Sequence, residues 1–121
     1  MNPPVFDKSQ LKYLETKNFP IGSMEEYALP NPEMGSLAIG RLDGAYPWGE
    51  SKWARNTLVD EWYVVREGEV SVTVEGSAPR NLKAGDWMYF PKGTWYQAKF
   101  NKALVDIPTI PAWTPQQSEW R

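Results

Sequence analysis

The sequence predicts a single-domain, all-β barrel, and three observations lead to this expectation. Short runs of aromatic and β-branched residues recur along the chain, glycines and prolines separate them, and helical periodicity is almost absent. This pattern is typical of an antiparallel sandwich or barrel. The 121 residues are enough for one sizeable core. We expect one barrel domain at 37–121, ending in an extended tail, with residues 1–36 as an irregular arm of the same domain.

The arm shows weak signals of local structure. Residues 7–15 contain a possible short helical turn, with Ser9 as a candidate cap, and 24–29 fit a short strand. Prolines at 20, 30 and 32 interrupt any longer element. We expect the arm to lie over the barrel or to reach a neighbouring subunit, and a partly frayed terminus is the alternative for its first dozen residues.

From residue 36 onward the strands are easier to recognise. We expect them at 37–42, 58–66, 70–74, 87–90, 94–100 and 104–107, with turns at 43–44, 67–68, 76–79 and 83–86. The segment 70–74 alternates most cleanly, so its valines and Val65 are predicted core residues. The tail after residue 110 is rich in proline, and we expect Trp113 to dock on the barrel.

Composition excludes several classes of function. The chain has no cysteine, which rules out disulfides and thiolate nucleophiles, and no histidine, which removes the commonest general base and metal ligand. A net charge of −2 gives no indication of the basic surface that nucleic acid binding requires. No apolar run has the length of a membrane span. The first residues do not read as a secretory signal, so we expect a cytoplasmic protein. Seven tryptophans and six tyrosines predict an aromatic-lined pocket or interface.

Two blocks of the chain carry a spaced motif around one carboxylate. Glu61 lies in an otherwise apolar run, and the glycines and the proline stand at fixed intervals on either side, at Gly49, Gly68, Gly85, Pro91 and Gly93. In this spacing the second half of the chain resembles the cupin family, the small RmlC-like double-stranded β-helix or jelly-roll barrels. The resemblance implies a barrel with one mouth and an internal metal site of three histidines and a glutamate.

The metal ligands implied by the resemblance are missing. The three histidine positions hold Arg55, Thr57 and Tyr96, and Phe100 replaces the asparagine that closes the second motif. A lone carboxylate with a hydroxyl and a phenol is a poor transition-metal site. We therefore expect no metal and no other cofactor, although a hard cation on the oxygens of Glu61 remains an alternative.

Strand alternation counted back from Glu61 places Thr57 and Arg55 on the same inward face. We expect the Arg55 guanidinium to pair with the Glu61 carboxylate where the metal would lie, and Tyr96 to donate its hydroxyl to the same carboxylate. Burial would raise the pKa of Glu61 and Arg55 would lower it, so the balance stays open. In the alternative interpretation, Glu61 only makes a structural hydrogen bond that stabilises the barrel.

Aromatic residues complete the candidate site. Trp48 and Trp53 precede the motif strand, at the expected mouth, whereas Tyr63 and Phe100 either contact a ligand or fill the core. Trp62 and Trp87 are candidates for an outer face that forms a homodimer, as is common in cupins.

Three functions remain open. The first is a metal-independent cupin that binds a small polar, anionic or aromatic metabolite through Arg55, Thr57, Glu61 and the aromatic residues. The second is a metal-free isomerase, epimerase or lyase with Glu61 as base and Tyr96 as acid. The third is a structural or assembly protein with a filled barrel. None of the three involves nucleic acid or a membrane.

Overall fold

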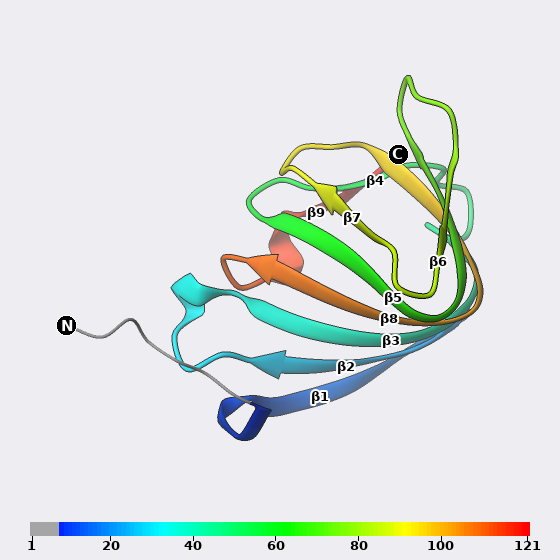
Figure 1. Cartoon of the computed structure of the whole chain (residues 1–121). Helices are drawn as coiled ribbons and strands as arrows, with labels where there is room; N and C mark the ends of the chain where they lie inside the picture. The colour runs from blue at the N-terminus through cyan, green and yellow to red at the C-terminus, as the bar shows by residue number, and fades with distance from the viewer. Residues whose placement is uncertain (1–7) are drawn as a thin grey trace.

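A computed structural model describes residues 8–121, and this part of the chain is all-β, as predicted (Figure 1). One strongly curled antiparallel sheet holds the nine strands β1 (Lys12–Phe19), β2 (Gly22–Ala28), β3 (Ser36–Tyr46), β4 (Ala54–Asn56), β5 (Asp60–Val74), β6 (Arg80–Lys83), β7 (Trp87–Phe90), β8 (Tyr96–Ile110) and β9 (Ser118–Trp120). Three short 3₁₀ turns, η1 (Lys8–Gln10), η2 (Pro32–Met34) and η3 (Pro115–Gln117), complete the elements. Among residues 8–121 no helix is long and apolar enough to cross a membrane.

The N-terminal region is more regular than we expected. The predicted helical turn at 7–15 is reduced to η1, which includes Ser9, while Asp7 lies outside the described residues. From Lys12 the chain forms the hairpin β1–β2, which extends the sheet beside β3 (Figure 1). The expected strand at 24–29 is the second half of this hairpin, and the prolines at 20 and 30 lie just outside its strands. The charged residues of β1 hid its strand character.

Two long strands bend the sheet into a barrel. The strands predicted at 58–66 and 70–74 merge into β5, and those predicted at 94–100 and 104–107 merge into β8. Both strands bulge where they face each other, and Gly68, with φ +75°, lies so close to the carbonyl oxygen of Lys102 that a Cβ there would be 2.3 Å away. Each bulge shifts the inward–outward alternation of the side chains. Residues before and after the bend can therefore both point into the barrel.

A third irregularity replaces the turn expected at 43–44. Strand β3 continues to Tyr46, with a register shift against β8 between Leu42 and Gly44. Gly44 has φ +134°, and a Cβ there would lie 2.6 Å from the side chain of Ile21. Glycine therefore allows the strand to continue past the hairpin tip instead of reversing, and Tyr46 reaches the barrel interior.

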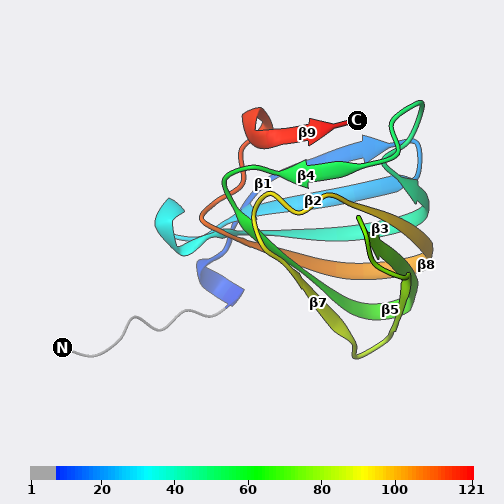
Figure 2. The same cartoon turned by 90° about the horizontal axis from the view of Figure 1, so that it is seen from above.

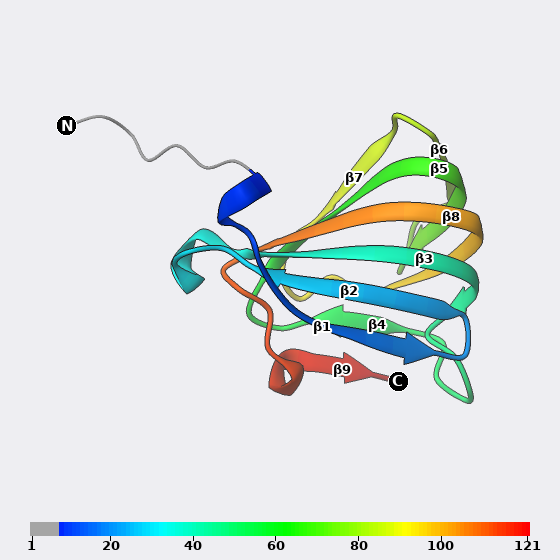
Figure 3. The ribbon, with the colours of Figure 1, turned by 90° about the horizontal axis from the view of Figure 1, so that it is seen from below.

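The C-terminal segment closes the barrel. Strand β9 pairs with β4, and Ala54 of β4 pairs with Tyr96 of β8. Figures 2 and 3 show β4 and β9 on the side of the barrel away from β7. Trp113 docks on the barrel as predicted, since its backbone N–H donates to Ser36 Oγ at 3.0 Å.

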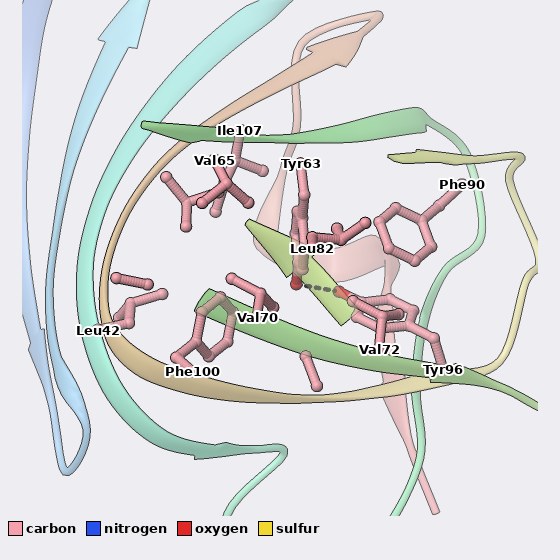
Figure 4. Packing of buried hydrophobic residues seen from close by; sticks show 13 residues of the cluster. Leu42, Tyr63, Val65, Val70, Val72, Leu82, Phe90, Tyr96, Phe100 and Ile107 are labelled. Carbon is pink, nitrogen blue, oxygen red and sulfur yellow. Dashed lines mark hydrogen bonds between the residues drawn. The ribbon is translucent and has the colours of Figure 1, made fainter. Parts of the chain in front are cut away.

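The core fills one part of the barrel interior (Figure 4). Val65, Val70, Val72 and Val105 are fully buried, which confirms the core prediction for the first three, while Val74 is partly buried against the same cluster. The aromatic rings of Tyr63, Phe90, Tyr96 and Phe100 pack beside these valines, with ring centroids 4.6 to 5.9 Å apart.

Candidate functional site

A cavity of about 360 Å³ lies beside this core, inside the curl of the sheet. Strands β1, β2, β3, β5 and β8 and the C-terminal tail all contribute to its wall. Most of the lining is apolar, with aromatic side chains from both ends of the chain. Glu61 is the most deeply buried carboxyl group in the lining, with only 8% of the residue exposed.

Glu61 is the acceptor at the end of a chain of hydroxyl groups. The Tyr96 hydroxyl donates to Glu61 Oε1 at 3.1 Å, as the sequence predicted, and the Tyr63 hydroxyl donates to the Tyr96 oxygen at 3.1 Å. Figure 4 shows the Tyr63–Tyr96 bond as a dashed line. Both tyrosines are buried, and burial together with the nearby Glu61 charge raises their pKa values well above the ordinary 10. They are therefore neutral hydrogen-bond donors.

Asn56 is the second partner of Glu61 and connects it to the tail. Its side chain hydrogen-bonds the Glu61 carboxylate. Its Oδ1 accepts from the Trp113 indole Nε1 at 3.3 Å and from Ser118 Oγ at 3.4 Å. Because the amide oxygen is occupied in this way, the amide N–H₂ is directed to the carboxylate.

The protonation of Glu61 reflects two opposing effects. Burial raises the pKa of Glu61 to about 7, and the hydrogen bonds from Tyr96 and Asn56 lower it only in part. The Arg55 charge, which we expected to oppose burial, does not act on it. At neutral pH both the acid and the carboxylate are therefore populated, as general acid–base catalysis requires.

Tyr46 supplies a further polar group to the cavity. Its hydroxyl accepts from the Trp120 indole Nε1 at 3.1 Å. Burial raises the pKa of Tyr46 to about 12, with a smaller contribution from the Glu61 charge, so this phenol is neutral too. Its ring contacts Trp48 edge-on, and Trp48 in turn lies against Phe19 with ring centroids 5.2 Å apart.

The structure brings together five of the eight predicted site residues. The residues that line the cavity are Trp48, Glu61, Tyr63, Tyr96 and Phe100. The other three, Trp53, Arg55 and Thr57, do not line it.

The expected Arg55–Glu61 pair is wrong. Arg55 lies opposite Glu119 in the β4–β9 ladder, donates to its carboxylate at 3.0 Å and stacks over Trp95, 4.5 Å from the ring centroid. Its inward neighbour Asn56 takes the place at Glu61 instead. Alternation was counted across residues 57–59, but these lie between two strands and do not preserve it.

Thr57 and Trp53 have structural contacts. The Thr57 hydroxyl donates to the backbone oxygen of Gln117 at 3.0 Å, and the Trp53 backbone exchanges two hydrogen bonds with Arg121. Both residues help to fasten the tail to β4. Their expected ligand contacts find no support in this arrangement.

Sequence reasoning missed several lining residues. Asn56 was hidden by the alternation error, and Tyr46 by the bulge before it. Lys17 and Glu26 come from the hairpin that we expected to be an irregular arm. Trp113 was expected to dock, but nothing in the local sequence indicated that it would bond Asn56.

The residues around Glu61 do not fit the metal site that the resemblance implied. Residues 8–121 contain no group of three or more histidine, cysteine, aspartate or glutamate side chains that could hold a metal ion. The polar neighbours of Glu61 are an amide and neutral phenols, which are weak ligands for a transition metal. We therefore derive no chemistry through a metal.

The strongly curled antiparallel sheet has the form of the cupin jelly-roll barrel that the motif spacing predicted. The model of the EutQ-like cupin domain family matches residues 46–107, about half of the chain, and the chain belongs to this family. A search of curated protein sequences gives no match.

Solved structures share the fold at low sequence identity. A variant of Streptomyces Pac13 with uridine superposes with a TM-score of 0.74 at 15% identity, covering 100% of this chain and 92% of that one. Pac13 is described as a unique nucleoside dehydratase. KdgF from Halomonas sp. gives a TM-score of 0.64 at 20% identity, with 89% and 94% covered. A Bacillus subtilis oxalate decarboxylase variant gives 0.71 at 17%, with 88% of this chain but 30% of that one covered.

Proposed function

We propose that this cupin binds a small molecule with a flat ring inside the barrel, and that Glu61 and Tyr96 orient it. The observation that carries the proposal is the aromatic-lined cavity of about 360 Å³ with a buried carboxyl group in its wall. Cavities of roughly 300–1,000 Å³ with apolar walls and a few convergent polar groups are typical of small-ligand sites. The Pac13 structure with uridine supports the proposal, because a protein of the same fold occurs with a small molecule that contains a flat ring.

The polar groups of the cavity suit a ligand with both donors and acceptors. Glu61 accepts when ionised and donates when protonated, so it matches either kind of group. A flat ring can pack against the rings of Trp48 and Tyr46, either face to face or edge to face. The third hypothesis, a filled barrel, requires that no such cavity opens, and the cavity argues against it.

Thermal-shift and calorimetric titrations test the proposal. The panel contains uridine and other nucleosides, free sugars and simple aromatic compounds. Ala38 lines the cavity on β3, so Ala38→Trp should occupy part of it and weaken any binding. Binding that Ala38→Trp leaves unchanged, or no binding across the panel, contradicts the proposal.

A second candidate function is acid–base catalysis at the same site, in an isomerase, epimerase or lyase. The contact between the Glu61 carboxylate and the Tyr96 hydroxyl favours it. Glu61 would take a proton from a carbon of the bound molecule, and Tyr96 would donate one to the departing or newly formed oxygen. A pKa of about 7 keeps Glu61 able to accept and return the proton at neutral pH.

Glu61→Gln separates the two functions once a ligand is known. The amide keeps the shape of the side chain but cannot accept a proton from carbon. For an enzyme, turnover falls by about 10² or more while binding persists. If Glu61→Gln keeps its turnover, Glu61 is not the catalytic base. If the parent protein binds the ligand without converting it, the first function, binding, is the one that stands.

A homodimer in the cytoplasm remains part of the proposal. Trp62 stacks on Tyr89 at 4.9 Å on the outer face, and Trp87 beside them is 64% exposed. An exposed aromatic face of this kind is typical of an interface. Light scattering of the parent protein and of Trp87→Ser tests the dimer, which a monomeric parent would contradict.

A further inference from the structure

Lys17 and Glu26 form a second polar cluster in the cavity, separate from Glu61. Lys17 extends from β1 and Glu26 from β2, and Lys17 Nζ lies 3.1 Å from Glu26 Oε1. The same ammonium group lies 4.8 Å from the centroid of the Trp113 ring, whose indole N–H bonds Asn56 beside Glu61. Trp113 therefore lies between the two polar clusters. Its ring contacts Lys17, and its indole N–H bonds Asn56, the partner of Glu61.

The charges that line the cavity are few. Among the residues that the structure describes, Lys17 is the only lysine or arginine in the lining, and the lining carboxyl groups are Glu26 and Glu61. The Lys17 side chain is 28% exposed and that of Glu26 is 18% exposed, so the pair is partly shielded from water. A Lys17 charge already paired with Glu26 leaves no free cation for an anionic ligand.

Other cations that could have served an anion are held on the outside. Arg55 and Arg121 both stack over Trp95, with their guanidinium carbons 4.5 and 4.3 Å from the ring centroid. Each also pairs with a carboxylate, Arg55 with Glu119 and Arg121 with Glu75. Neither lines the cavity. The expectation that Arg55 would favour an anionic ligand therefore has no support.

We infer that the cavity selects an uncharged ligand over an anionic analogue of the same shape, and that Glu26 is the specificity-determining residue because it neutralises Lys17. This inference rests on the proposed function, since it concerns the ligand of the same cavity. An uncharged ring compound with hydroxyl groups would hydrogen-bond Lys17, Glu26 and Glu61 without introducing a charge. A phosphorylated or carboxylated analogue would meet two carboxyl groups and one cation that is already paired.

Two fluorescent dyes test the inference without knowledge of the natural ligand. Anilinonaphthalene sulfonate is an anion, and phenylnaphthylamine is its uncharged parent with the same rings. The parent protein should bind the uncharged dye at least about tenfold more tightly than the anion. Glu26→Gln removes the nearer of the two carboxylate partners of Lys17, so it should improve binding of the anion about tenfold relative to binding of the uncharged dye.

Glu15→Gln is the matched control. Glu15 is the other carboxylate near Lys17, at 3.6 Å, but its side chain is 56% exposed and does not line the cavity. This variant makes the same change in net charge and should change binding of either dye by less than about twofold. Ala38→Trp should weaken binding of both dyes if they occupy the cavity, because the larger side chain takes up part of it.

The outcomes separate the inference from the proposed function. Equal affinity of the parent protein for the two dyes, or the same effect of Glu26→Gln and Glu15→Gln, overturns the selection against anions and leaves the cavity as a ligand site. Failure of the uncharged dye to bind, or binding that Ala38→Trp does not affect, contradicts the proposed function and the inference together.

Discussion

Replacing Glu61 by glutamine should make the stability of the folded protein less dependent on pH. Folding raises the pKa of Glu61 from its ordinary 4.5 to about 7. Between these values the folded state keeps a proton that the unfolded state has lost, so the Glu61 contribution to stability is complete below pH 4.5 and is lost as the pH rises to about 7. At about 1.4 kcal/mol per pH unit, the loss amounts to roughly 3 kcal/mol.

The measurement is urea unfolding of the parent protein and of Glu61→Gln at several pH values from 4 to 9. Glutamine resembles the protonated acid and does not titrate. The free energy of unfolding of the variant minus that of the parent should therefore increase by roughly 3 kcal/mol between pH 4 and pH 8. Other titrating groups cancel in this difference, because both proteins contain them.

Glu69→Gln provides the matched control, since Glu69 is an exposed residue of the same strand. The free energy of unfolding of Glu69→Gln minus that of the parent should change by less than about 1 kcal/mol over the same pH range. A difference between Glu61→Gln and the parent that stays constant with pH would refute the reasoning. It would mean that Glu61 is ionised in the folded protein at pH 5, with its burial offset by partners stronger than Tyr96 and Asn56.

Three further predictions concern the neighbours of Glu61 and the barrel corner. Tyr96→Phe removes a hydrogen bond to the carboxylate and should raise the pKa of Glu61 above 7 in a carbon NMR titration, whereas an unchanged or lower pKa would contradict the described contact. Arg55→Leu should leave that pKa unchanged and cost at most about 2 kcal/mol in urea unfolding, the loss of one exposed ion pair and one ring contact. Gly68→Ala should destabilise by more than about 2 kcal/mol, because its Cβ would meet backbone oxygen atoms, whereas Gly76→Ala, with a positive φ but open space, should cost about 1 kcal/mol. Equal costs at the two glycines would show that the close approach at Gly68 does not matter.

Much of the barrel could be predicted because its signals are local. The alternating valines and the glycine spacing are read from neighbouring residues, and the Glu61–Tyr96 bond was predicted from motif positions that share one site. The structure confirms that bond at 3.1 Å. The roles of both residues in binding or catalysis remain predictions.

The rest of the site depends on features with no local signal. Whether Arg55 or Asn56 faces Glu61 depends on three residues that leave the strand, and alternation cannot be carried across such a break. Lys17 reaches the cavity only because its hairpin, with mixed charges on both strands, joins the sheet. Lys17 can be partly buried because it pairs with Glu26, which lies on the other strand of the hairpin.

The pairing of β9 with β4 has a consequence for when the cavity is completed during synthesis. Glu119 pairs with Arg55 across 64 positions of sequence, and Trp113 and Ser118 hold the Asn56 amide that touches Glu61. A nascent chain that ends before residue 113 has the valine core but lacks a wall of the cavity and the orientation of Asn56. Contacts between such distant residues form late and slowly. A complete cavity therefore requires that the tail has been synthesised and paired with β4, and a chain truncated before β9 should keep strands but lose this wall of the cavity.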